Sequence, residues 1–165
     1  MGADVSFSLC DLRDLSSVAS DFDVIISCDN AIPHLLTDDD LGRAFASMHS
    51  KLRDRGLLVL SVRDYDRAML ERTPTAMPDI RPGPPRRVVV RLHDWDGPDS
   101  PMYTVRFLVL TEGSTGWTID HYGTRYRALG RAALTGMAQT AGFKRVLWHT
   151  AEQVGFHQPV MTAFR

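Results

Sequence analysis

The 165-residue sequence predicts one α/β domain in which a parallel sheet carries an antiparallel meander. Residues 23–28 and 56–62 are nearly continuous apolar runs, which is typical of strands buried on both faces. The segment between them has the apolar spacing of a crossover helix, and such a helix joins parallel strands. Three further strand-like runs follow at close spacing with no helix between them, and this pattern predicts the meander.

The first third of the chain supplies the parallel part of the predicted sheet. Residues 5–10 alternate apolar and small polar side chains, which predicts a short strand. Thr37 is expected to cap a helix, because the three Asp residues that follow it suit the positive end of the helix dipole. Apolar residues then recur at helical spacing as far as Leu52, and Gly56 is expected to stop the helix.

The remainder of the chain is expected to hold the meander and the final strands. A loop with five prolines covers residues 73–85. The meander strands are expected at 87–95, 103–111 and 117–126, followed by a helix over 128–141 and strands over 143–149 and 159–164.

Composition excludes several classes of protein. The 19 basic and 20 acidic residues give a net charge of -1, so no basic surplus is available for a nucleic-acid partner. No apolar run reaches the roughly 18 residues of a membrane span. The first residues fit a loose myristoylation pattern but lack the features of a signal peptide, and the alternation from Val5 favours a domain that begins at once. Two cysteines, Cys10 and Cys28, make no disulfide framework, so a cytoplasmic location is expected.

Polar side chains follow each of the three predicted parallel strands. Because such strands end at one edge of a sheet, their trailing loops are expected to share a crevice. These loops hold Cys10, Asp11 and Leu12; Cys28, Asp29, Asn30 and His34; and Arg63, Asp64, Tyr65 and Asp66.

Each of these side chains also has a purely structural explanation. Asp11 suits a turn, Asn30 suits a left-handed loop position, and His34 suits packing or the surface. Residues 63–66 suit an exposed cluster of ion pairs at a strand end. The sequence contains no P-loop, G-x-S-x-G or G-x-G-x-x-G motif, which disfavours a dehydrogenase. Its histidines and cysteines show no metal-ligand spacing, so no metal site is expected.

Four ordered motifs resemble class I S-adenosylmethionine-dependent methyltransferases, in particular the branch of glycine N-methyltransferase. Residues 22–35 (FDVIISCDNAIPHL) resemble the family's fourth strand and the motif after it. Residues 52–60 (LRDRGLLVL) resemble the approach to its fifth strand. Residues 61–66 (SVRDYD) are similar to an R-[DN]-Y-D signature, and residues 155–160 (GFHQPV) resemble a tail of related bacterial enzymes. The resemblance covers residues 5–165.

The resemblance implies a truncated Rossmann-like methyltransferase sheet, with strands equivalent to 3-4-5-7-6 of the family, in a single domain over residues 1–165. The meander over residues 87–126 would be a lid insertion above a small-molecule acceptor. S-adenosylmethionine would be the cofactor. The residues that the resemblance places against this cofactor are Cys10, Asp11, Leu12, Cys28, Asp29 and Asn30.

The resemblance also implies an acceptor that is an amine or bears a carboxylate. Asn30 and His34 would border the point of methyl transfer, Arg63 would pair with the acceptor carboxylate, and Tyr65 would support Arg63. The residues expected to contact the acceptor from the lid are Tyr122, Arg125 and Tyr126.

The family's Gly-rich strand–loop and its ribose-binding acidic strand have no counterpart here, a difference of roughly 50–70 residues. Asp29 also stands where the glycine-using relatives tend to have Gly. The strand around Val24 would then have a bare apolar edge, which favours a homodimer joined through exposed strand edges. Two alternatives remain open. The chain is a catalytically inactive, methyltransferase-like oligomeric binding module, or the natural protein has an N-terminal segment that precedes this sequence.

Overall fold

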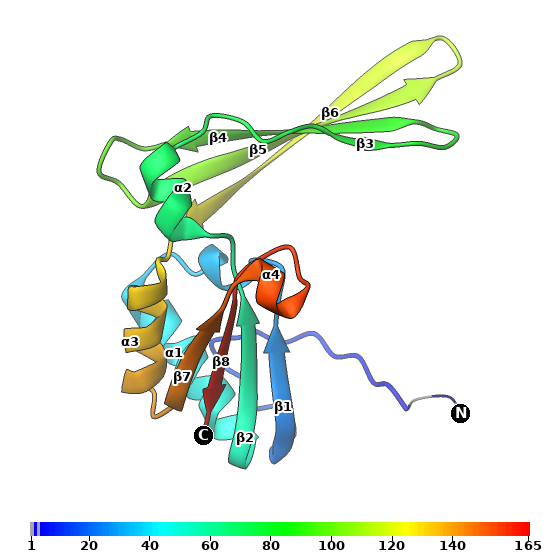
Figure 1. Ribbon diagram of the computed structural model, residues 1–165. Coiled ribbons are helices and arrows are strands. Elements are labelled where there is room, and N and C mark those ends of the chain that lie inside the picture. The colour runs from blue at the N-terminus through cyan, green and yellow to red at the C-terminus, as the bar shows by residue number, and fades with distance from the viewer. Residues whose placement is uncertain (1, 3) are drawn as a thin grey trace.

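The computed structural model describes Gly2 and residues 4–165 and contains two four-stranded sheets (Figure 1). Met1 and Ala3, and with them the myristoylation-like start, lie outside the described residues. The first sheet has the order β1-β2-β8-β7, and its strands are β1 (Phe22–Ser27), β2 (Leu52–Ser61), β7 (Lys144–His149) and β8 (Val160–Phe164). The second sheet has the order β3-β4-β5-β6, with β3 (Asp79–Arg81), β4 (Arg87–Trp95), β5 (Met102–Gly113) and β6 (Gly116–Arg127).

Pairing in the first sheet confirms the predicted methyltransferase-like order. β1 and β2 are parallel, and β8 runs antiparallel to both β2 and β7. The strands thus correspond to 4-5-7-6 of the expected order. The helices α1 (Asp38–Lys51) and α3 (Arg131–Thr140) pack together beside this sheet (Figure 1).

Helix α1 begins where the sequence predicts. The Thr37 side chain accepts a hydrogen bond from the backbone N–H of Asp40 at 3.1 Å, which satisfies one free donor of the first turn. The apolar stripe is buried in the core, at Leu41, Ala44, Phe45 and Met48. The prediction that Gly56 stops the helix is wrong.

Gly56 lies inside β2, which begins directly after α1. The register of β1 with β2 shifts between Phe22 and Val24, and a Cβ on Gly56 would meet the carbonyl oxygen of Arg53 at 2.8 Å. Gly56 therefore permits a close backbone approach at this irregularity, which helical spacing alone does not reveal.

The predicted strand over residues 5–10 is absent: the described residues 4–10 form no strand, and Phe7 is 94% exposed. A strand needs a neighbour for its backbone hydrogen bonds, and in Figure 1 this segment extends away from the sheet. The equivalent of strand 3 is therefore missing from the sheet. The β1 strand, expected to be buried on both faces, has one open face with Val24 and Ile26 exposed.

The antiparallel meander is confirmed. β4 matches its predicted bounds, and β5 and β6 extend each predicted strand by a few residues. The short strand β3 adds to it from the proline-rich loop. We call β3–β6 the lid sheet, because it lies across the carboxyl ends of β1 and β2 (Figure 1).

Three short helical segments lie between the two sheets or at their junction, and they carry the loops of the candidate site. They are η1 (Ile32–His34), α2 (Tyr65–Glu71) and α4 (Ala151–Val154). Within the described part of the chain, no helix has both the length and the apolar character that crossing a bilayer requires.

Candidate functional site

The loop after β1 is fixed to the end of β2 by backbone hydrogen bonds. Asp29 and Asn30 both have left-handed backbone conformations, with φ of 62° and 68°. The N–H of Asp29 donates to Ser61 Oγ at 2.9 Å, and the N–H of Asn30 donates to the Ser61 carbonyl at 3.3 Å. Asn and Asp tolerate this conformation better than most residues, so the sequence here suits a sharp turn at the strand end.

The side chain of Asn30 joins this loop to the residues that follow β2. Its Oδ1 accepts a hydrogen bond from the backbone N–H of Arg63 at 3.1 Å, and its Nδ2 donates to Tyr65 Oη at 2.9 Å. Because a backbone N–H can only donate, these two contacts fix the orientation of the amide. The Tyr65 hydroxyl lies 2.8 Å from that of Tyr103 on β5, so the chain of polar contacts reaches the lid sheet.

Arg63 meets a histidine of the lid sheet. Its Nη1 lies 3.4 Å from His93 Nε2, while His93 Nδ1 lies 3.1 Å from the carbonyl oxygen of Thr73. A carbonyl oxygen only accepts, so Nδ1 carries the proton and Nε2 offers a lone pair toward Arg63. Burial lowers the pKa of His93, and the positive charges of Arg63 and Arg91 lower it further, so the neutral imidazole is favoured.

Aromatic rings form one wall of the site. Tyr103 stacks on Trp95 with ring centroids 4.6 Å apart and contacts Tyr126 at 5.6 Å. His34 lies against the other side of Tyr126, at 4.3 Å. Burial raises the pKa of Tyr65, Tyr103 and Tyr126, so all three hydroxyls stay protonated at neutral pH.

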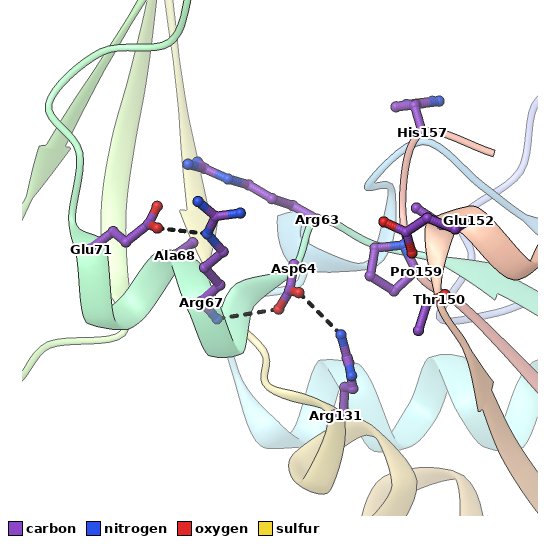
Figure 2. Close-up of a pocket in the computed structure, with 11 residues that line it drawn as sticks. Arg63, Asp64, Arg67, Ala68, Glu71, Arg131, Thr150, Glu152, His157 and Pro159 are labelled. Carbon is purple, nitrogen blue, oxygen red and sulfur yellow. Dashed lines mark hydrogen bonds and ion pairs between the residues drawn. The ribbon is translucent and has the colours of Figure 1, made fainter. Parts of the chain in front are cut away.

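Two cavities meet at Arg63. The lid cavity, about 430 Å³, lies between the β1 loop and the lid sheet, and its lining includes Asn30, Arg63, Arg91, His93, Tyr103 and Tyr126. The helix cavity, about 460 Å³, is lined from α2, α3 and α4 and includes Arg67, Glu71 and Arg131 (Figure 2). Arg63 and His157 line both cavities, so the two spaces are adjacent.

Several residues expected at the site are brought together by the structure. Asp29, Asn30, Arg63 and Tyr126 line the lid cavity. Tyr65 is buried beside them, and Cys28 is half-buried at the end of β1. His34 does not line this cavity but contacts Tyr126 on it.

Other expected residues lie elsewhere. Tyr122 is 61% exposed, and Arg125 is held on the lid surface by Asp96 at 2.6 Å, so neither lines the cavity. Arg125 points away because side chains alternate between the two faces of β6, whereas Tyr122 shares the face of Tyr126 but lies farther along the strand, opposite Phe107. Cys10, Asp11 and Leu12 follow no strand, and neither cavity includes them.

The Asp11 carboxylate is engaged by Arg13, whose hydrogen bonds lower the pKa of Asp11 to about 2. Arg13 also bridges to Asp40 at the start of α1, at 2.9 Å. Asp29 and Asn30 thus offer polar atoms at the cavity rim, whereas Asp11 is occupied by a cation. The described residues thus place Asp29 and Asn30 on the lid cavity and leave Asp11 outside both cavities.

Sequence reasoning missed Arg91, His93 and Tyr103, which the lid sheet places over the cavity. A signal was present, because Arg91, His93 and Trp95 alternate with Leu92 and Asp94 and therefore share one face of β4. That pattern identifies a face of the strand, but it does not show which residues the face lies against.

No protein-family model matches the sequence, and a search against curated proteins finds no match either. Solved structures, by contrast, are similar over nearly the whole chain. An S-adenosylmethionine-dependent methyltransferase from Clostridium acetobutylicum has a TM-score of 0.69 at 11% identity, over 95% of this chain and 62% of its own. CalS10, an amino pentose methyltransferase from Micromonospora echinaspora, has a TM-score of 0.72 at 17% identity, over 94% of this chain and 63% of its own.

The sugar N-methyltransferase KedS8 from Streptoalloteichus has a TM-score of 0.72 at 15% identity, over 94% of this chain and 60% of its own. The chain thus spans a little over 60% of the length of these proteins. Over that part, it has the fold of the S-adenosylmethionine-dependent methyltransferases.

Proposed function

We propose that the chain takes part in S-adenosylmethionine-dependent methyl transfer to a small-molecule acceptor that is an amine or bears a carboxylate. The observation that carries this proposal is the meeting of Asn30 and Arg63 with the lid residues His93 and Tyr103 around one cavity. This cavity lies at the carboxyl ends of parallel strands, where open α/β sheets bind their ligands. The amino pentose and sugar N-methyltransferases of similar fold support an amine acceptor.

The chain's own residues would bind and orient the acceptor. The Arg63 guanidinium would hold an acceptor carboxylate by paired hydrogen bonds, and Asn30 fixes the backbone from which Arg63 extends. Tyr65 supports Asn30, and the lid sheet would exclude water from above. Cys28, Asp29 and Asn30 would contact the cofactor, as the resemblance implies, and the cofactor would supply an activated methyl group when bound. Such alignment needs no covalent intermediate on the protein.

A second candidate function is a binding module without catalysis. The observation that favours it is the engagement of Asp11 by Arg13, because Asp11 is an expected cofactor contact and is paired with a cation instead. In that case, the lid cavity would bind its small molecule with no methyl group transferred.

Calorimetry of the chain with S-adenosylhomocysteine separates the two functions. Methyl transfer predicts saturable binding that weakens when Asn30 is replaced by Ala, because Asn30 borders both the cofactor and the cavity. Replacing Asp120, a residue of β6 outside the cavity, by Ala provides the control. Absence of any binding heat at ligand concentrations up to the millimolar range would contradict methyl transfer by this chain alone and favour the binding module.

We also propose a cytoplasmic homodimer joined at the free edge of β1. Among the described residues, β1 pairs with β2 alone, and Val24 and Ile26 are exposed on its open face. Unpaired strand edges with apolar side chains recruit a second chain. Light scattering at micromolar concentration is expected to give twice the chain mass, and Ile26→Lys is expected to give monomers. A monodisperse wild-type monomer would contradict the dimer.

A further inference from the structure

The two cavities differ in how their arginines are paired with carboxylates. In the helix cavity, Arg67 pairs with Glu71 at 2.6 Å and Arg131 pairs with Asp64 at 3.1 Å, as the dashed lines in Figure 2 mark. Arg63 extends away from these pairs toward the lid strands (Figure 2). It makes no salt bridge with any of the described residues, and its side chain meets the neutral groups His93 and Tyr103.

Arg91 brings a second positive charge to the lid cavity. It lies on β4 two residues before His93, so alternation places both on one face of the strand. Arg91 is half-buried, and it too lacks a salt-bridge partner within the described part of the chain. Both arginines line the same cavity as His93, and their positive charges add to burial in lowering the pKa of His93.

Arg63 and Arg91 lack carboxylate partners among the described residues, although the chain has many acidic residues. Nine of the chain's 17 arginines form salt bridges with carboxylates of the described residues. Asp29 is the acidic residue that lines the lid cavity, but it is mostly exposed and contacts His157 at 3.0 Å. Two half-buried cations without acids between them repel each other, and a bound anion relieves that repulsion.

We infer that the lid cavity recognises an acceptor with two separate anionic groups, one bound by Arg63 and the other by Arg91. Arg63 contacts His93, and Arg91 lies two residues, about 7 Å, along β4 from His93, so the two anionic groups would bind several ångströms apart. A four-carbon dicarboxylate has about this reach, whereas a single carboxylate occupies one guanidinium and leaves the other uncompensated. The inference names the substrate class of the proposed function, but the binding that it describes needs no cofactor.

The test compares a dianion with a monoanion at constant ionic strength. The arginine Nε–H signals of the ¹⁵N-labelled chain are followed by NMR during titration with succinate or with acetate. Succinate is expected to bind about tenfold more tightly than acetate, the gain of a second partly buried ion pair. Arg91→Ala is expected to reduce succinate affinity to the level of acetate and to leave acetate affinity unchanged, whereas Arg63→Ala weakens both.

Arg87→Ala is the matched control, because it removes the same charge from an exposed position on the same strand. It is expected to leave both affinities unchanged. The inference is overturned if succinate shows no saturable binding or no preference over acetate. It is also overturned if Arg91→Ala weakens both anions alike, or if Arg87→Ala reduces succinate affinity as much as Arg91→Ala does. Retained succinate preference without S-adenosylhomocysteine binding would instead contradict methyl transfer and leave this inference standing.

Discussion

The hydroxyl groups of Tyr65 and Tyr103 lie 2.8 Å apart in a buried hydrogen bond between α2 and the lid sheet. Tyr65 also accepts from the Asn30 side chain at 2.9 Å. One of the two hydroxyls donates and the other accepts, so each tyrosine satisfies the other. The two sheets are thus connected by a series of hydrogen bonds through the buried hydroxyls of Tyr65 and Tyr103, and removing either hydroxyl leaves a buried polar group without a partner.

Tyr65→Phe is expected to lower the free energy of unfolding by about 1–3 kcal/mol, because Asn30 Nδ2 loses its acceptor and the Tyr103 hydroxyl loses its hydrogen-bond partner. Urea denaturation measures this change. Tyr122→Phe is the control, since Tyr122 is mostly exposed, and its effect is expected to stay within about 0.5 kcal/mol. Equal effects of the two substitutions would show that the buried hydrogen bonds of Tyr65 contribute nothing to stability.

The same substitution is expected to have opposite effects at two glycines near the end of α3. Gly142 has φ of 101°, and an added Cβ would lie 3.1 Å from the ring of His49. Gly142→Ala should therefore destabilise the fold by about 1–2 kcal/mol or more. Gly136 lies within α3 with nothing close to an added Cβ, so Gly136→Ala should stabilise by about 0.5–1 kcal/mol. Thermal unfolding of both variants checks these signs, and a shift of Tm in the same direction would contradict the geometry at Gly142.

Stability is expected to fall as pH is lowered from 7.5 to 5.5. Burial lowers the pKa of His93 below the ordinary value of 6.5, and burial also lowers the pKa values of His34 and His49. Below pH 6.5, the unfolded chain therefore binds more protons than the folded chain, and the free energy of unfolding decreases. Denaturant titrations across this range measure the slope.

His93→Gln removes one titrating group and keeps a side chain that can hydrogen-bond, so the slope between pH 7.5 and 5.5 is expected to become smaller. His157→Gln serves as the control, because His157 is exposed on the loop after α4. An unchanged slope in His93→Gln would show that the folded protein does not hold His93 in its neutral form.

Much of the first sheet was predictable from local patterns. The apolar residues of α1 and of β2 are buried in the same core. Their spacing in the sequence therefore predicts which side chains are buried. The segment at residues 5–10 shows the limit of such patterns. Alternation describes a chain suited to a strand, but a strand forms only where a partner offers hydrogen bonds, and the partner is a property of the whole fold.

Of the candidate site, only the residues that follow β1 and β2 were predictable from the sequence. Asn30 and Arg63 follow strands β1 and β2, and the rule that parallel strands end at one edge places them together. The site residues that come from the lid sheet depend on how that sheet lies over the edge. Arg91 and His93 are brought to Arg63 by this tertiary arrangement, whereas Arg125 lies on the opposite face of β6 and Tyr122 lies farther along that strand, outside the cavity lining. No spacing in the sequence encodes either result.

The most direct test of the proposed function is methyl transfer from S-adenosylmethionine to a panel of amines that bear carboxylates. Arg63→Ala is expected to reduce acceptor turnover by at least about 100-fold, because the acceptor loses the group that aligns it, and to leave S-adenosylhomocysteine affinity unchanged. Arg67→Ala, which removes an arginine already paired with Glu71, is expected to retain wild-type turnover. Turnover that is unchanged in Arg63→Ala would contradict the account.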